Sequence, residues 1–192
     1  MTSTPRSRDN FVSNSIILNF NRVSGFQTPS QDLMTVQVNI RGHDSPVRAL
    51  IDNGAQTSLI SSRMVKRYGL PTVATHQTVR GIGNQTLPVT QSTRVPLVGN
   101  SGRIVDVNCL VLNGWQLDCI TTPNVPSSMR TLRLADTQGN DQPIEMLLGA
   151  NALAQVLIPQ QRLTDGVLAQ NTIFGWAVQS ICNTTAESSD DG

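Results

Sequence analysis

The sequence predicts a mainly β protein, in which short strands form a closed or sandwiched architecture with one or two short helices. Residues 33–40, LMTVQVNI, alternate apolar and polar side chains, as a half-buried strand does. Clusters of Gly, Pro, Asn and Ser separate further short apolar runs. Signals for helices are few by comparison. Many short strands with few helices are typical of β-barrels and sandwiches.

The first two expected strands form a hairpin. Residues 41–46, RGHDSP, have the composition of a turn. The apolar run over residues 47–52 then pairs with the strand before the turn and ends at Asp52. A short helix is expected over residues 61–68, because Ser61 or Ser62 can cap its start, and Gly69 and Pro71 follow its end.

The remaining elements are shorter or less regular. The sequence predicts short strands over residues 76–98 and 103–112, a long polar connection over 113–143 with a short helix near 127–134, an apolar strand over 144–151 that runs into a short helix, and a last ordered run over 172–178. With 192 residues, the chain suits one domain over residues 13–182, between a disordered segment at 1–12 and a disordered acidic tail at 183–192.

Composition excludes several classes of function. The net charge is +1, and the 14 Lys and Arg residues are scattered, so neither nucleic acid nor a membrane surface is an expected partner. No apolar run approaches the roughly 20 residues of a membrane span, and no signal peptide begins the chain, which predicts a soluble, intracellular protein. Three cysteines without a repeated spacing and two isolated histidines favour no metal site, and no cofactor is expected.

Asp52 is the strongest candidate for catalysis. An aspartic protease needs two carboxylates that share one proton: one activates water and the other protonates the scissile carbonyl. Such an Asp must end a buried strand, and a Gly two positions later permits the sharp turn. Residues 47–55, VRALIDNGA, meet both demands, with Asn53, Gly54 and Ala55 completing the loop. An apolar strand ending in Asp-Asn-Gly is also typical of an ordinary hairpin turn.

Two further segments favour the catalytic interpretation. Leu147, Leu148 and Gly149 match the apolar-apolar-Gly strand that crosses beneath the catalytic loop of aspartic proteases, and would support it. A Gly-rich hairpin would form a flap over a peptide substrate, comprising Gly81, Ile82, Gly83, Asn84 and Gln85. The sequences after Asp136 and Asp165 do not have the Asp-x-Gly spacing. The second carboxylate is therefore expected from another copy of the chain.

Three blocks together resemble the retropepsin-like aspartic peptidase domain of Pao/BEL-type LTR retrotransposons. They are RALIDNGAQTSLI at residues 48–60 with RYGLP at 67–71, LAD at 134–136 with IEMLLGAN at 144–151, and AQNTIFGW at 169–176. The resemblance spans roughly residues 33–180. It implies a retropepsin-like acid-protease fold, a closed β domain that forms homodimers with one Asp from each subunit, and a polypeptide substrate such as a Gag-Pol-like polyprotein. The compartment would be the cytoplasm or a retroelement particle.

Asn53 departs from this pattern, since the family usually has Ser or Thr after the catalytic Asp. In retropepsins that hydroxyl braces the two loops across the dimer, and the amide of Asn also offers a donor and an acceptor. Three hypotheses stay open: an active aspartic endopeptidase, a weakly active or inactive domesticated module for dimerisation or peptide binding, and a retropepsin-like domain of the ubiquitin-receptor type, whose flap has a similar Gly-x-Gly-x-Gln pattern.

Overall fold

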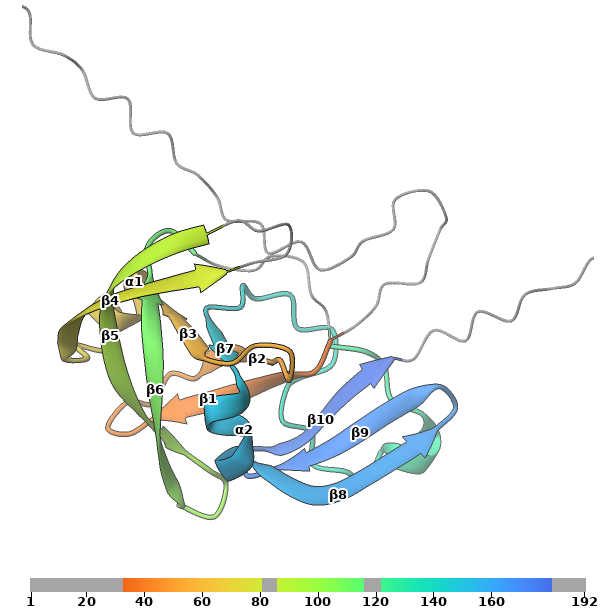
Figure 1. Cartoon of the computed structure of the whole chain (residues 1–192). Coiled ribbons are helices and arrows are strands. Elements are labelled where there is room, and N and C mark those ends of the chain that lie inside the picture. The colour runs from red at the N-terminus through yellow and green to blue at the C-terminus, as the bar shows by residue number, and fades with distance from the viewer. Residues whose placement is uncertain (1–32, 81–85, 116–121, 181–192) are drawn as a thin grey trace, which may run out of the picture.

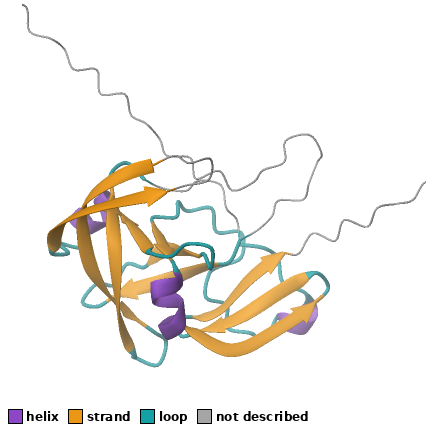
Figure 2. Ribbon diagram, in the orientation of Figure 1, coloured by secondary structure: helices purple, strands orange, loops and turns teal. Residues whose placement is uncertain are grey.

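The computed structural model describes residues 33–80, 86–115 and 122–180. Strands dominate it, and its two α-helices and one 3-10 helix are short (Figure 2). This confirms the mainly β fold class. In chain order the elements are β1 (Thr35–Ile40), β2 (Val47–Ile51), β3 (Ser58–Ser61), α1 (Ser62–Arg67), β4 (Thr72–Arg80), β5 (Thr86–Val98), β6 (Ile104–Leu112), η2 (Ser127–Met129), β7 (Met146–Leu148), α2 (Ala150–Val156), β8 (Leu157–Thr164), β9 (Val167–Thr172) and β10 (Gly175–Ser180).

Six strands close into a ring, in the order β1-β2-β7-β3-β6-β5, with β5 pairing back to β1. β5 is 13 residues long, and its first half leaves the ring to form a hairpin with β4. Alternate side chains of every ring strand point inward, and the interior holds apolar residues including Val36, Ala49, Ile60, Leu97, Val107, Cys109 and Met146. The closed β domain expected from the sequence is therefore present.

The predicted hairpin and helix are also present. β1 and β2 pair antiparallel, with Val38 opposite Val47, and the turn between them contains Gly42 at a φ of +82°. The hydroxyl of Ser61 accepts a hydrogen bond from the amide of Met64 and caps α1. Gly69, two residues past the end of α1, has a φ of +57°, which suits glycine.

A second sheet, β10-β9-β8, lies beside the ring, and α2 leads directly from β7 into it (Figure 1). The sequence predicted one ordered run over residues 172–178, but the structure divides these residues between two strands. β9 ends at Thr172, and β10 begins at Gly175. The hydroxyl of Thr172 donates to the carbonyl of Gly175 and accepts from the amide of Phe174, which closes a tight turn. Trp176 is half-buried, and the guanidinium of Arg162 lies over its ring.

The long connection before β7 joins the two sheets. Its last part contains the segment Leu134–Ala135–Asp136. The amide of Gln37 in β1 donates to the carbonyl of Ala135, and the amide of Ala135 donates to the carbonyl of Trp176 in β10. Gly175 is required at this junction, because a Cβ there would lie 2.7 Å from the carbonyl oxygen of Arg133. The connection therefore ties the second sheet to β1.

Candidate active site

Asp52 lies in a tight turn directly after β2. Its amide donates to the carbonyl of Leu148 at 3.0 Å, and its Oδ1 accepts from the amide of Gly54 at 2.9 Å. The amide of Ala55 approaches the Asp52 carbonyl at 3.4 Å. Asp52 and Ala55 are partly exposed, while Asn53 and Gly54 are exposed. The described residues give Oδ2 of Asp52 no hydrogen-bond donor, so one face of this carboxylate is open.

The short strand β7 lies between the two strands that flank the Asp52 turn. Leu50 and Leu147 are neighbours in the parallel pairing of β2 with β7, and Leu59 and Leu147 are neighbours in the antiparallel pairing of β3 with β7. Leu147 and Leu148 are buried, on opposite faces of the strand. Because β7 pairs on both edges, it holds the two ends of the loop at a fixed separation.

Gly149 continues β7 beneath the loop, where backbone approaches backbone. A Cβ on Gly149 would lie 2.8 Å from the carbonyl oxygen of Ala55 and 2.8 Å from both the carbonyl carbon and oxygen of Thr57. The next amide, that of Ala150, donates to the Ala55 carbonyl at 2.8 Å. The residue at position 149 must therefore have no side chain for the loop to sit where it does.

A polar cluster fastens the far end of the loop, and sequence analysis missed it. The hydroxyl of Ser58 donates to Oδ1 of Asn151 at 2.7 Å and accepts from the amide of Gly149 at 3.0 Å. The Asn151 Oδ1 also accepts from the amide of Ser58, and its Nδ2 donates to the carbonyl of Asn108. The burial of Ser58 and its pairing with Asn151 depend on the fold, so no local pattern in the sequence indicated this cluster.

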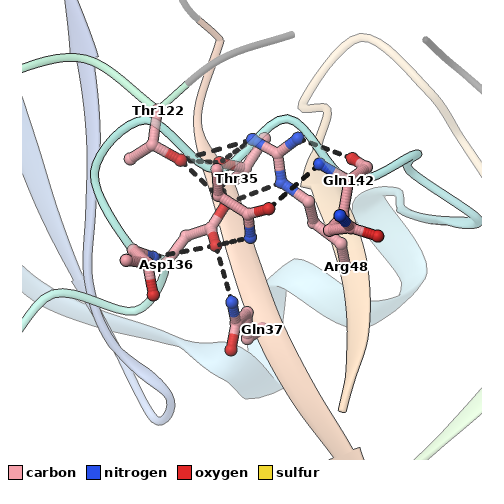
Figure 3. Close-up of polar contacts among 8 residues, drawn as sticks. Thr35, Gln37, Arg48, Thr122, Asp136 and Gln142 are labelled. Atoms are coloured by element: carbon pink, nitrogen blue, oxygen red, sulfur yellow. Dashed lines mark hydrogen bonds and ion pairs between the residues drawn. The ribbon is translucent and has the colours of Figure 1, made fainter. Parts of the chain in front are cut away.

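Asp136 was rejected as a catalytic residue because its glycine comes one position later than in Asp-x-Gly. In the structure it lies in a buried polar cluster that does not include Asp52. It is buried and accepts six hydrogen bonds, among them 2.8 Å from Nε of Arg48 and 2.7 Å from the hydroxyl of Thr35 (Figure 3). The other donors are the Gln37 side chain, the Thr122 hydroxyl, the Thr137 amide and the Asn140 side chain.

These contacts keep Asp136 charged. Burial raises the pKa of its carboxyl, but hydrogen bonds from Thr35, Arg48, Asn140 and Thr122 outweigh burial and hold the pKa below its ordinary value. Glu145, the other buried acid of the described residues, accepts from Arg63 at 2.6 Å and from Ser61 at 3.2 Å. Neither carboxylate is hydrogen-bonded to Asp52. Within the described part of the chain, Asp52 thus has no acidic partner.

The sequence also singled out Asp165-Gly166 and the expected flap at residues 81–85. Asp165 and Gly166 form the turn between β8 and β9, with φ values of 49° and 71°. The expected flap residues 81–85 lie outside the described residues, between β4 and β5. The flap assignment therefore stays a prediction, as do the segments proposed as disordered at either end of the chain.

The sequence of residues 36–152 matches the family model of the aspartyl proteases. The chain belongs to the aspartyl protease family. The matched range contains both Asp52 and Gly149, and it ends before the second sheet. It confirms the aspartic protease resemblance drawn from the sequence at the level of the family, whereas the Pao/BEL affiliation stays a prediction.

Two solved structures resemble this aspartyl protease chain. One is the EIAV protease in complex with the inhibitor HBY-793, at 18% identity and a TM-score of 0.37, covering 68% of this chain and 91% of the other. The second is the retroviral protease-like domain of Ddi1 from Leishmania major, at 16% identity and a TM-score of 0.39, covering 80% and 98%. No curated protein matches the sequence. Among the described residues, no helix is long and apolar enough to cross a membrane.

Proposed function

We propose that this chain is a retropepsin-like aspartic endopeptidase, which hydrolyses peptide bonds with a water molecule activated by two copies of Asp52 across a homodimer. The main support for this proposal is the position of the Asp52 turn, which β7 and Gly149 hold from beneath. The carboxylate follows a buried strand, one oxygen accepts from the Gly54 amide, and the other has no hydrogen-bond donor among the described residues. This is the support that a reacting carboxylate needs, because catalytic geometry must be held within fractions of an ångström.

The homodimer follows from the chemistry of the dyad. One carboxylate must be ionised as base while a second is protonated as acid, and both must lie within hydrogen-bond reach of one water. Asp136 and Glu145, the buried acids of the described residues, already have donors of their own, and this supports Asp52 of a second copy as the partner. A two-fold axis beside the turn would bring the two open carboxylate faces together. The proposed substrate is a polyprotein of a retroelement, in keeping with the Pao/BEL-like sequence blocks.

Replacing Asp52 with Asn is expected to abolish cleavage. An amide cannot act as base, so peptide-library cleavage at acidic pH should fall by at least about a thousandfold, with the fold retained by circular dichroism. Asp44→Asn, which changes an exposed carboxylate in the β1–β2 turn, is the matched control and should cleave like the wild type. Equal cleavage by the Asp52→Asn protein and the wild type would end the catalytic proposal.

Mixing the two proteins tests the dimer separately. If subunits exchange freely, an about ninefold excess of the Asp52→Asn protein should lower wild-type activity to about a tenth, because most wild-type subunits then have an inactive partner. A monomeric enzyme would keep its full activity. Activity that is insensitive to the excess, together with sedimentation as a monomer at the assay concentration, would contradict the shared dyad while leaving the protease proposal intact.

Asn53 is the feature that favours the second candidate function, an inactive binding or dimerisation module. It is exposed beside Asp52. If its amide braces the two loops across the dimer, Asn53→Ala should lower kcat about tenfold or more, and Asn53→Thr should retain activity, since a hydroxyl also donates and accepts. The measurement is steady-state cleavage of one peptide. An inactive wild type that gains cleavage through Asn53→Thr would instead support the inactive module.

A further inference from the structure

β2, the strand that leads into Asp52, carries a buried arginine. Arg48 lies four residues before Asp52 on β2, about 13 Å away along an extended strand. Arg48 is 5% exposed, and every other residue of β2 is apolar. An arginine is almost never buried unless its charge is paired and its donors are used. The ion pair with Asp136 at 2.8 Å satisfies the charge, and the remaining donors show what else Arg48 holds.

Arg48 holds the segment that enters β7 at two points. Its Nη1 donates to the carbonyl of Gln142 at 2.7 Å (Figure 3). Its own carbonyl accepts from the amide of Glu145 at 3.2 Å. The next residue, Met146, begins β7. One residue of β2 therefore fixes the chain immediately before the strand that crosses beneath Asp52.

Asp136 contacts both Arg48 and the segment that leads to Gln142. Its Oδ2 accepts from Nε of Arg48, and its Oδ1 accepts from Nδ2 of Asn140 at 2.7 Å. Oδ1 of Asn140 in turn accepts from the amide of Gln142 at 3.0 Å. The Asp136 carboxylate thus orients the Arg48 guanidinium toward Gln142. Through Asn140 it is also linked to the backbone of Gln142.

The register of β7 determines the position of Asp52. The three-residue strand has few ladder hydrogen bonds of its own, and a slip by one residue would turn Leu147 and Leu148 to the wrong faces. It would also remove the bonds from the Asp52 amide to Leu148 and from the Ala150 amide to Ala55. A clamp at the entrance of β7 would prevent such a slip.

We infer that Arg48 and Asp136 are positioning residues, which set the register of β7 through Gln142 and so align the Asp52 loop. The inference rests on the proposed function for its effect on catalysis, but the alignment itself can be measured without activity. Arg48→Lys is the sharpest test: lysine keeps a charge for Asp136, yet its single ammonium cannot replace the guanidinium fork that reaches Asp136 and Gln142 together.

The first readout is amide hydrogen exchange in the full-length protein. In Arg48→Lys, peptides containing the amides of Asp52 and Ala150 should exchange at least about tenfold faster, while peptides from the β5–β6 turn should exchange as in the wild type. The second readout is a split in the kinetics: kcat falls about tenfold or more and KM changes less than about twofold. Arg94→Lys, in the exposed ion pair with Asp106, is the matched control and should change neither readout.

A milder variant covers the case in which Arg48→Lys does not fold. Asn140→Ala keeps the ion pair and removes only the link from Asp136 to Gln142. Amide hydrogen exchange at Asp52 and Ala150 should therefore rise by a smaller factor than in Arg48→Lys. Exchange at Asp52 and Ala150 that equals the wild type in both variants would overturn the inference. So would a uniform rise across all peptides, which indicates a loss of stability alone. Absence of cleavage by the wild type would count against the proposed function, and the exchange result would still decide the role of the pair.

Discussion

Gly149→Ala is expected to have one of the two largest effects of any single substitution, lowering the free energy of unfolding by about 3 kcal/mol or more and eliminating cleavage. The backbone of Gly149 is extended, with φ −91° and ψ −175°, so alanine is not excluded by backbone conformation. The cost is steric: a methyl group would lie 2.8 Å from backbone atoms of Ala55 and Thr57, which cannot rotate away as side chains do. Urea unfolding followed by circular dichroism measures the change.

Gly42→Ala separates this steric effect from the general cost of replacing a glycine. Gly42 has a φ of +82° and open space around its Cα, so alanine there is strained only by its backbone conformation. That strain costs about 1–2 kcal/mol. The turn and Asp52 lie at opposite ends of β2, so cleavage by folded protein should be unchanged. A Gly149→Ala protein that is as stable and as active as Gly42→Ala would show that the loop can move away from β7.

Asp136→Asn is the second substitution expected to have a large effect. It leaves the buried guanidinium of Arg48 without a counter-charge and converts an acceptor of six hydrogen bonds into a neutral amide. Removing one partner of a buried ion pair typically costs about 3–5 kcal/mol, because the remaining charge is desolvated and unpaired. The side chains of Arg48 and Asp136 are 3% and 1% exposed, so solvent provides little compensation. Thermal and urea unfolding near neutral pH should show the loss.

Asp106→Asn is the matched control, since it breaks an ion pair with Arg94 whose side chains are 42% and 69% exposed. Exposed pairs contribute about 0–1 kcal/mol, so little change in the free energy of unfolding is expected.

The pH dependence of stability gives a further check on the charge of Asp136. Because the pKa of Asp136 lies below its ordinary value of 3.8, its contribution is complete above that value and is lost as pH falls through the lower, folded-state pKa. The stability difference between wild type and Asp136→Asn should therefore shrink only in strong acid. A difference that is already lost near pH 5 would contradict this account.

The parts of the fold that could be predicted from sequence are those determined by neighbouring residues. The β1–β2 hairpin follows from the alternation over residues 33–40 and from the turn cluster after it, and α1 follows from its Ser61 cap and from Gly69. These signals act over a few residues, so one sequence contains them. The closed ring required the family resemblance in addition, because its β5–β1 closure joins residues far apart in the chain.

The second sheet was missed because its strands lack the expected pattern. β8 is exposed along most of its length and has three successive polar residues, Gln160, Gln161 and Arg162, so apolar residues do not alternate along it. The turn after Thr172 lies inside an apolar run, with Ile173 and Phe174 buried, and it depends on the Thr172 hydroxyl and on Gly175. Tertiary contacts, not local composition, determine these elements.

The partners of Asp136 were missed for a related reason. Arg48 and Asp136 are 88 residues apart, and Asp136 was considered as a candidate catalytic residue and as part of a family motif, not as the partner of a buried arginine. The useful signal was Arg48 itself, since an arginine in an otherwise apolar strand requires a buried acid elsewhere. Ser58 and Asn151 illustrate the same limit: each is unremarkable locally, and their hydrogen bonds join residues 93 positions apart.

The place of β7 in the ring has a consequence for when the protein acquires its site. β2 and β3 are synthesised before β7, the strand that pairs with both of them and lies about a hundred positions after β2. Pairings of such long range form slowly, because a long loop must close before the contact is gained. During synthesis the turn around Asp52 therefore lacks its support until residues 146–151 have emerged. The order of elements in the chain thus delays assembly of the turn around Asp52 until most of the domain has been synthesised.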